Sequence, residues 1–160
     1  MVHITIAAVG KVKERYLTEG IDEYSKRLRR YCRLSVIEVA DEKTPDGASE
    51  AEEEKIRSVE GRRLLDALPK QGLRIALTID GRRQDSPAMA KRIEELSVQG
   101  DGHLIFLIGG SLGLSKDVIR SAAEQWSFSD LTFPHQLMRM ILLEQIYRSF
   151  RILRNEPYHK

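Results

Sequence analysis

The chain has 160 residues, of which 41% are hydrophobic and 31% are charged. This size and composition are typical of one compact domain, predicted to span residues 1–160, and they argue against a disordered polymer or a membrane protein. The net charge of +2 is too small to establish a nucleic-acid partner, because phosphate binding depends on the local density of Lys and Arg.

Apolar runs typical of strands alternate along the chain with stretches of helical periodicity. The first strand is predicted from Val2 to Val9, and its start lacks the pattern of an export signal, so we expect a cytoplasmic protein. A helix is predicted from Tyr16 to Tyr31 and a second strand from Leu34 to Val39. Cys32 between them is the only cysteine, which excludes an internal disulfide and a cysteine-clustered zinc site.

The same alternation continues to the end of the chain. After a turn at residues 44–47, the pattern predicts three more strands and four more helices. The strands are expected over Leu73–Ile79 and His103–Ile108 with a short one near Phe128–Thr132, and the helices over Ser49–Leu68, Pro87–Val98, Lys116–Gln125 and His135–Leu153. Five strands alternating with five helices predict an α/β fold: a mostly parallel sheet with helices on both faces.

The loop after the strand at residues 103–108 is rich in glycine. In open parallel sheets, ligands bind beyond the carboxyl ends of the strands, and Gly109, Gly110 and Gly113 would let the backbone approach a ligand closely. Their spacing matches neither a dinucleotide fingerprint nor a Walker A loop, so phosphate binding is unsupported. A tight connection to the next helix, capped by Ser115, would alone account for one or two of the glycines.

The last helix is apolar over an arc too wide for a simple surface helix. One apolar face can pack on the sheet, and the other would be exposed in a monomer, so we expect a homodimer with this helix at its interface. Glu144 and Arg148 are spaced as an ordinary helix-surface ion pair. The polar tail that follows, residues 155–160, is either a frayed terminus or a source of a stacking ring and a titrating group, Tyr158 and His159.

Charge is unevenly distributed along the chain. The segment from Asp41 to Glu54 holds most of the acidic excess, whereas the basic residues gather in three clusters. For each basic cluster, a solvated helix face and an RNA contact are equally open interpretations. The clusters are Lys11, Lys13 and Arg15; Lys26, Arg27, Arg29, Arg30 and Arg33; and Arg139, Arg148, Arg151, Arg154 and Lys160.

Several contiguous motifs are distributed along the chain: Ala7–Lys11, Phe106–Ser115, Leu131–Arg139, Glu144–Arg148 and Pro157–Lys160. Taken together, they resemble one family, the RlmH-type SPOUT methyltransferases. The resemblance runs over nearly the whole chain and is weakest in the acidic segment 41–54 and at residues 81–84.

This resemblance implies that the C-terminal part of the fold is threaded as a deep trefoil knot, an exception to the rule that chains are unknotted. It also implies a bound S-adenosyl-L-methionine (SAM), the methyl donor, in a crevice built by three loops, with no metal required. The residues that match these loops are Leu77, Gly109, Phe128, Ser129, Asp130, Leu131, Thr132 and Phe133.

The activity that the resemblance implies is methylation of N3 of a pseudouridine in bacterial large-subunit (23S) ribosomal RNA, with the assembled ribosome as substrate. N3 carries a proton between two carbonyls, so a base or an anion-stabilising cation is expected. The candidates are His135, Arg139, Tyr158 and His159. The tail of one subunit is expected near the methyl group, while the partner subunit helps to present the RNA.

Two rival hypotheses remain. The first is a catalytically silent RNA-binding module of the same fold, which saturable SAM binding with methyl transfer would exclude. The second is a small α/β nucleotide-binding enzyme unrelated to methylation, which the absence of Walker A and GxGxxG patterns disfavours.

Overall fold

The computed structural model describes residues 1–160 and contains one five-stranded sheet in the order β2-β1-β4-β3-β5. Every neighbouring pair of strands is parallel, so the predicted parallel sheet is confirmed. The strands are β1 (Val2–Val9), β2 (Cys32–Val39), β3 (Leu73–Arg82), β4 (His103–Ile108) and β5 (Glu124–Trp126).

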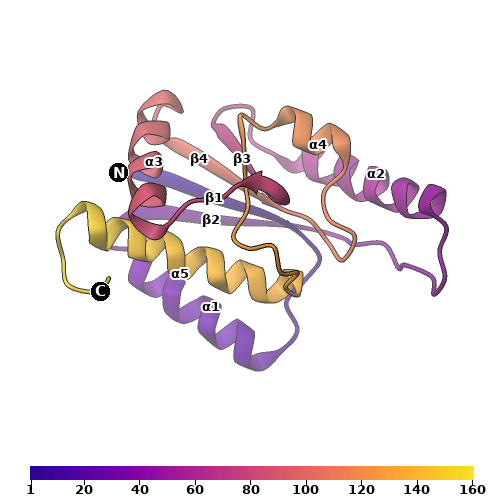
Figure 1. Cartoon of the computed structure of the whole chain (residues 1–160), viewed down its shortest axis with the longest axis horizontal. Coiled ribbons are helices and arrows are strands. Elements are labelled where there is room, and N and C mark those ends of the chain that lie inside the picture. Colours follow the sequence, from indigo (N-terminus) through magenta and orange to yellow (C-terminus); the bar gives the residue numbers. More distant parts are fainter.

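Helices cover both faces of this sheet, as predicted (Figure 1). One face carries α1, α3 and α5, and the other carries α2 and α4. The helices are α1 (Arg15–Leu28), α2 (Glu50–Ala67), α3 (Ser86–Gln99), α4 (Lys116–Ser121) and α5 (His135–Leu153). None of them is both long enough and apolar enough to cross a bilayer.

The two central strands are buried on both faces because every residue of their core segments is apolar or small. On β4, Leu104 and Phe106 point into the larger core under α1, α3 and α5, whereas Ile105 and Leu107 point into the smaller core under α2 and α4. Successive side chains on a strand point to opposite faces, so an uninterrupted apolar run supplies both cores at once.

The prediction for residues 116–132 is wrong in its boundaries. The helix expected to reach Gln125 ends at Ser121, and the strand expected near Phe128–Thr132 lies instead at Glu124–Trp126. Ala122 already has extended backbone angles, and the amide of Ala123 donates to the carbonyl of Arg74 at 2.8 Å. The helix ends here because the backbone groups of the following residues form hydrogen bonds with the free edge of β3.

Smaller differences occur at two other ends. Helix α1 stops at Leu28 rather than Tyr31, and Tyr31 is buried beyond it. Strand β3 extends past Ile79 to Arg82, where it pairs with β5 after a register shift. Cys32 is buried, and this burial raises the pKa of its thiol to about 12.

Helix α5 lies beside α1 and α3 in the layer that covers the larger core (Figure 1). Leu142, Leu143 and Ile146 are buried in that core. The predicted Glu144–Arg148 ion pair is confirmed, with Arg148 Nη2 and Glu144 Oε1 2.5 Å apart. The apolar arc of α5 therefore packs against the sheet and against its two neighbours, α1 and α3.

Candidate cofactor and active site

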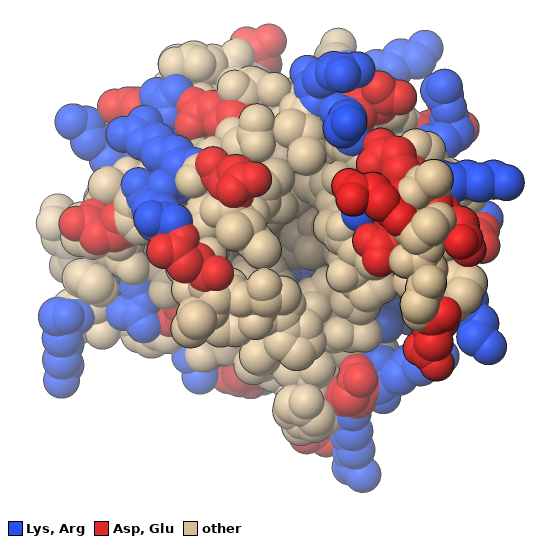
Figure 2. All heavy atoms as spheres, turned by 45° about the vertical axis from the view of Figure 1, so that its right-hand side comes forward, with Lys and Arg blue, Asp and Glu red and all other residues tan.

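A cavity of about 910 Å³, here called the large cavity, opens beyond the carboxyl ends of β3, β4 and β5. Its size lies in the range of about 300–1,000 Å³ that is usual for small-molecule sites. Figure 2 shows a hollow at the centre of this face, with acidic side chains gathered along one side of it. The walls are formed by Glu50, Glu54 and Arg57 of α2, residues 77–79 of β3, residues 108–114, 116 and 119 after β4, and residues 126–129, 131–136 and 138.

The glycine-rich loop forms a closed turn on one wall of the large cavity. The amide of Gly113 donates to the carbonyl of Gly110 at 3.0 Å, and Gly113 has a φ of +83°. A Cβ atom added at Gly109 would overlap the backbone of Gly113. Ser115 then caps α4 by accepting from the amide of Val118. Glycine at 109 is therefore needed by the turn itself, whether or not a ligand also approaches it.

Two side chains of helix α2, Arg57 and Glu60, lie against this turn. The Arg57 guanidinium donates to the carbonyl of Leu112 at 3.4 Å, and a Cβ added at Gly110 would lie 3.3 Å from both carboxylate oxygens of Glu60. Glu60 is buried and accepts from the amide of Glu42 at 2.9 Å, while its Oε1 has no partner. Burial raises the pKa of the Glu60 carboxyl above its usual value.

The segment after β5 forms the opposite wall. The amide of Ser127 donates to the carbonyl of Arg82 at 2.9 Å, which ties this segment to the end of β3. Ser129 Oγ then accepts from the amide of Leu131 at 2.9 Å and closes a short turn. Leu131 is 69% exposed and Ile79 is 51% exposed, and both line the large cavity. Apolar side chains left in solvent at the mouth of a cavity indicate a binding surface.

The residues predicted to bind the cofactor come from three separate parts of the chain, and the structure brings all of them but one to the large cavity. Leu77, Gly109 and the segment from Phe128 to Phe133 line it, with the exception of Asp130. Asp130 forms an ion pair with Arg83 instead, and the two side chains are largely exposed.

Two of the predicted catalytic residues lie near the start of α5. His135 lines the large cavity, and burial lowers the pKa of its imidazole. Arg139 is buried one turn further along α5 and does not line that cavity. Its guanidinium pairs with Glu38 and donates to the carbonyl of Gly10 at 3.2 Å, while its Nε has no partner.

The other two predicted catalytic residues lie on the tail, which folds back along the C-terminal half of α5. Tyr158 Oη donates to Glu144 Oε1 at 3.0 Å, and its ring meets the Tyr147 ring edge-on with centroids 4.9 Å apart. Arg148 Nη1 lies 3.2 Å from His159 Nδ1. The tail is thus ordered against α5. Within one chain, Tyr158 and His159 do not line the large cavity.

His159 lines a second, smaller pocket of about 520 Å³. Phe128 is the residue that lines both the small pocket and the large cavity, so the two spaces share a wall. The structure therefore separates the predicted catalytic residues into three places: His135 at the large cavity, Arg139 under it, and the tail at the small pocket.

Sequence reasoning missed the contribution of α2. Glu50 and Glu54 line the large cavity, although they belong to the acidic segment in which the family resemblance is weakest. A capping box was the available signal: Ser49 accepts from the amide of Glu52, and the Glu52 side chain accepts from the amide of Ser49. It predicts where the helix begins, but not that this end of α2 faces the glycine turn.

The motifs of this site can be compared with those of known proteins. A family described as "Predicted SPOUT methyltransferase" matches residues 2–159. The chain belongs to the SPOUT methyltransferase family. Two of its full-length relatives are ribosomal RNA large subunit methyltransferase H 1 of Clostridium perfringens strain SM101, 52% identical with 99% of both chains covered, and a candidate ribosomal RNA large subunit methyltransferase H of Methanococcus maripaludis, 54% identical with the same coverage. The resemblance deduced from the motifs is thereby confirmed.

Solved structures share the overall fold of this chain at low sequence identity. A methylase family protein from Haemophilus influenzae has a TM-score of 0.51 at 10% identity, covering 95% of this chain and 66% of the other. A second one, from Neisseria gonorrhoeae, has a TM-score of 0.50 at 12% identity, covering 91% of this chain and 80% of the other.

Proposed function

We propose that this SPOUT family member transfers the methyl group of SAM to N3 of a pseudouridine in bacterial 23S ribosomal RNA. The observation that carries the proposal is the large cavity, in which three loops matched by the family motifs meet at the carboxyl ends of β3, β4 and β5. The names of the full-length relatives support the large-subunit RNA as substrate.

The residues of the large cavity fit SAM in size and chemistry. Leu77, Leu131 and Phe133 offer apolar walls for an adenine ring, and backbone groups of the glycine turn can bind its polar edge. Glu50 and Glu54 face the same space and carry the charge that an ammonium or a sulfonium group attracts. When bound, SAM would supply an electrophilic methyl group.

The chain's own residues must position the acceptor and manage its proton. His135 is neutral at physiological pH because burial lowers its pKa, so it is able to accept a proton at the cavity. His159 is the second candidate base, at the small pocket on the far side of Phe128. Arg139 is held in an ion pair with Glu38, so its proposed part is to keep the start of α5 in place rather than to touch the substrate.

A basic surface is available for ribosomal RNA at one end of the helical layer. Lys26, Arg29 and Arg30 at the end of α1 and Arg154 at the end of α5 have no carboxylate within 4.0 Å, whereas Arg27, Arg148 and Arg151 are paired. Arg30 and Arg154 both lie over the Tyr31 ring, which places the two helix ends together. We propose that this patch contacts the RNA of the assembled ribosome, in the cytoplasm.

The proposal includes a homodimer and a knotted C-terminal segment. Met138, Ile141 and Gln145 form a half-buried strip along α5, bordering both the large cavity and the small pocket, that a second copy can cover. The segment after β5 passes so close to β3 that a Cβ at Gly81 would lie 2.6 Å from the Trp126 carbonyl carbon. Threading as a trefoil knot would make the fully stretched chain measurably shorter in a mechanical extension experiment than its 160 residues allow.

The function is tested by mass mapping of 23S ribosomal RNA from cells with and without the gene. We expect one methyl group on one pseudouridine to be lost, and purified protein with labelled SAM to restore it. Parallel reactions with free RNA, large subunits and 70S ribosomes then identify the substrate. Saturable SAM binding without transfer to any of these would instead support the silent RNA-binding module.

A further inference from the structure

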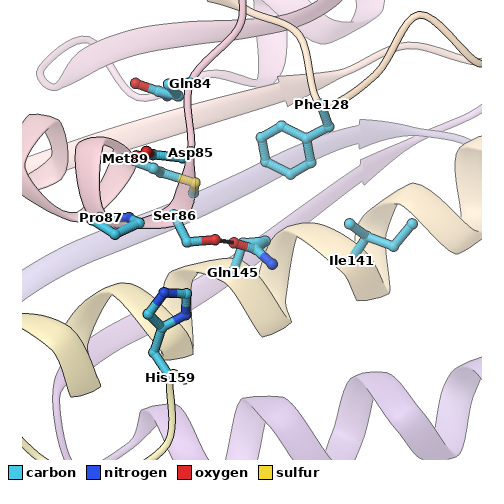
Figure 3. Close-up of a pocket in the computed structure, with 9 residues that line it drawn as sticks. All are labelled: Gln84, Asp85, Ser86, Pro87, Met89, Phe128, Ile141, Gln145 and His159. Atoms are coloured by element: carbon cyan, nitrogen blue, oxygen red, sulfur yellow. Dashed lines mark hydrogen bonds between the residues drawn. The ribbon is translucent and has the colours of Figure 1, made fainter.

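The small pocket adjoins the large cavity at Phe128. Figure 3 shows the residues that line the small pocket. Polar side chains come from the end of β3 and the start of α3, from α5 and from the tail, and Phe128 contributes the only aromatic carbocyclic ring. The pocket is lined by Gln84, Asp85, Ser86, Pro87, Met89, Phe128, Ile141, Gln145 and His159. Its volume of about 520 Å³ suits a base with its sugar.

Two polar side chains of this pocket, Ser86 and Gln84, keep hydrogen-bonding capacity for a ligand. Ser86 Oγ donates to Gln145 Oε1 at 2.8 Å, so the proton of Ser86 is committed and its lone pairs remain. Gln145 is itself fixed because its Nε2 donates to Glu144 Oε2 at 2.8 Å. Gln84 also lines the pocket, and its Nε2 is a buried donor without a partner.

A uracil-type base can be bound by one hydrogen-bond donor, one acceptor and an aromatic ring. It carries a carbonyl next to an N–H, so one donor and one acceptor satisfy a single edge, and its face can stack on an aromatic ring. Pseudouridine differs from uridine in having a free N1–H, because its sugar is attached to carbon rather than to N1. An acceptor that reads N1–H would therefore select pseudouridine and leave N3 on the other side of the C2 carbonyl.

We propose that the small pocket binds the acceptor base after it is flipped out of the RNA, with the base stacked on Phe128. Ser86 Oγ accepts the N1–H of pseudouridine, and Gln84 Nε2 donates to the C2 carbonyl. Phe128 lines both spaces, so the N3 edge of the stacked base would have to extend past the edge of this ring to reach the large cavity, where the methyl donor is proposed to bind. This assignment rests on the proposed function and adds to it the residues that distinguish pseudouridine from uridine.

The test compares Ser86→Ala and Gln84→Ala with Gln99→Ala, a matched control at the exposed far end of α3. The substrates are 70S ribosomes that lack the methyl group, carrying either pseudouridine or uridine at the target position. Loss of one hydrogen bond to the base should lower kcat/KM on pseudouridine about tenfold, with SAM affinity by calorimetry unchanged. For Ser86→Ala, the preference for pseudouridine over uridine should fall by a similar factor, and Gln99→Ala should behave as wild type.

Normal kcat/KM and normal preference in both pocket variants, with an active wild type, would overturn the pocket assignment alone. An equal fall in kcat/KM on both substrates in Ser86→Ala, with the preference for pseudouridine unchanged, would also overturn it, because Ser86 would then not accept the N1–H. No transfer by the wild type to either ribosome would overturn the proposed function, and the pocket assignment with it.

Discussion

Gly109 is the single residue on which the large cavity most depends, because a Cβ there would overlap the backbone of Gly113 in the same turn. We expect Gly109→Ala to open the turn and reduce SAM affinity below detection in calorimetry, even though the added group is only a methyl. Gly47→Ala is the control for backbone strain alone: at φ +69° an alanine is strained, but nothing lies within 4 Å of its added Cβ, so SAM affinity should be kept. Unchanged SAM affinity in folded Gly109→Ala would remove the glycine turn from the site.

His3 and His103 form a stacked pair on adjacent strands, with ring centroids 4.1 Å apart and His103 Nε2 2.8 Å from Thr5 Oγ1. Burial, with Arg33 nearby, lowers the pKa of both imidazoles from 6.5. Below that pH the unfolded chain therefore binds more protons than the folded one, so the free energy of unfolding falls as the pH decreases.

Urea unfolding at several pH values measures this effect. The stability of the wild type should be nearly constant above the ordinary histidine pKa of 6.5 and should decrease below it. His103→Gln, which keeps a hydrogen-bonding group near Thr5 but does not titrate, should show a shallower decrease. If the free energy of unfolding decreased equally steeply with pH in the two proteins, the stacked histidine pair would not be the cause of the loss of stability below pH 6.5.

At the scale of an element, the tail and α5 act together. Tyr158 packs on Tyr147 and donates to Glu144, and burial followed by the Glu144 hydrogen bond raises the pKa of its phenol. Removing residues 158–160 should therefore reduce stability by about 1–2 kcal/mol. A frayed terminus, one of the two interpretations that the sequence left open, would instead give almost no loss of stability, because it buries little surface.

A substitution at His159 distinguishes a catalytic role of the tail from its packing role, because the His159 side chain is exposed. His159→Ala should leave the melting temperature unchanged and lower methyl transfer about a hundredfold, the scale of losing a positioned acid-base group. If His159 accepts the N3 proton, the acidic limb of the pH–rate profile should also flatten. Lys160→Ala is the control next to it, and near-normal turnover by His159→Ala would move the role of base to His135.

At the scale of the whole molecule, we expect a homodimer through the half-buried strip of α5. The wild type should sediment at about twice the chain mass of 18.3 kDa at micromolar concentration. Ile141→Glu puts a charge in the middle of the strip and should give a folded monomer, whereas Val98→Glu, at a side chain 79% exposed on α3, should remain dimeric. A compact wild-type monomer would show that α1 and α3 cover α5 sufficiently within one chain.

Local pattern was sufficient for most of the fold. The apolar run of His103–Ile108 and the helical period of α5 are properties of consecutive residues, so the strand, the helix and the α/β class followed from the sequence. The family motifs, also contiguous, led to the three loops that meet at the large cavity. At Glu124–Trp126 the pattern failed, because pairing with β3 depends on a partner that lies far away along the chain.

Only the tertiary structure decided which polar residues share a site. Asp130 and Arg139 have the right types and positions in the motifs, yet ion pairs with Arg83 and Glu38 hold them away from the large cavity. The capping box predicts where α2 begins, but the positions of Glu50, Glu54 and the Ser86–Gln145 hydrogen bond depend on how α2, α3 and α5 pack. Secondary structure depends mainly on neighbours along the chain, whereas a binding site depends on distances between segments, and those distances are set by the packing of the whole core.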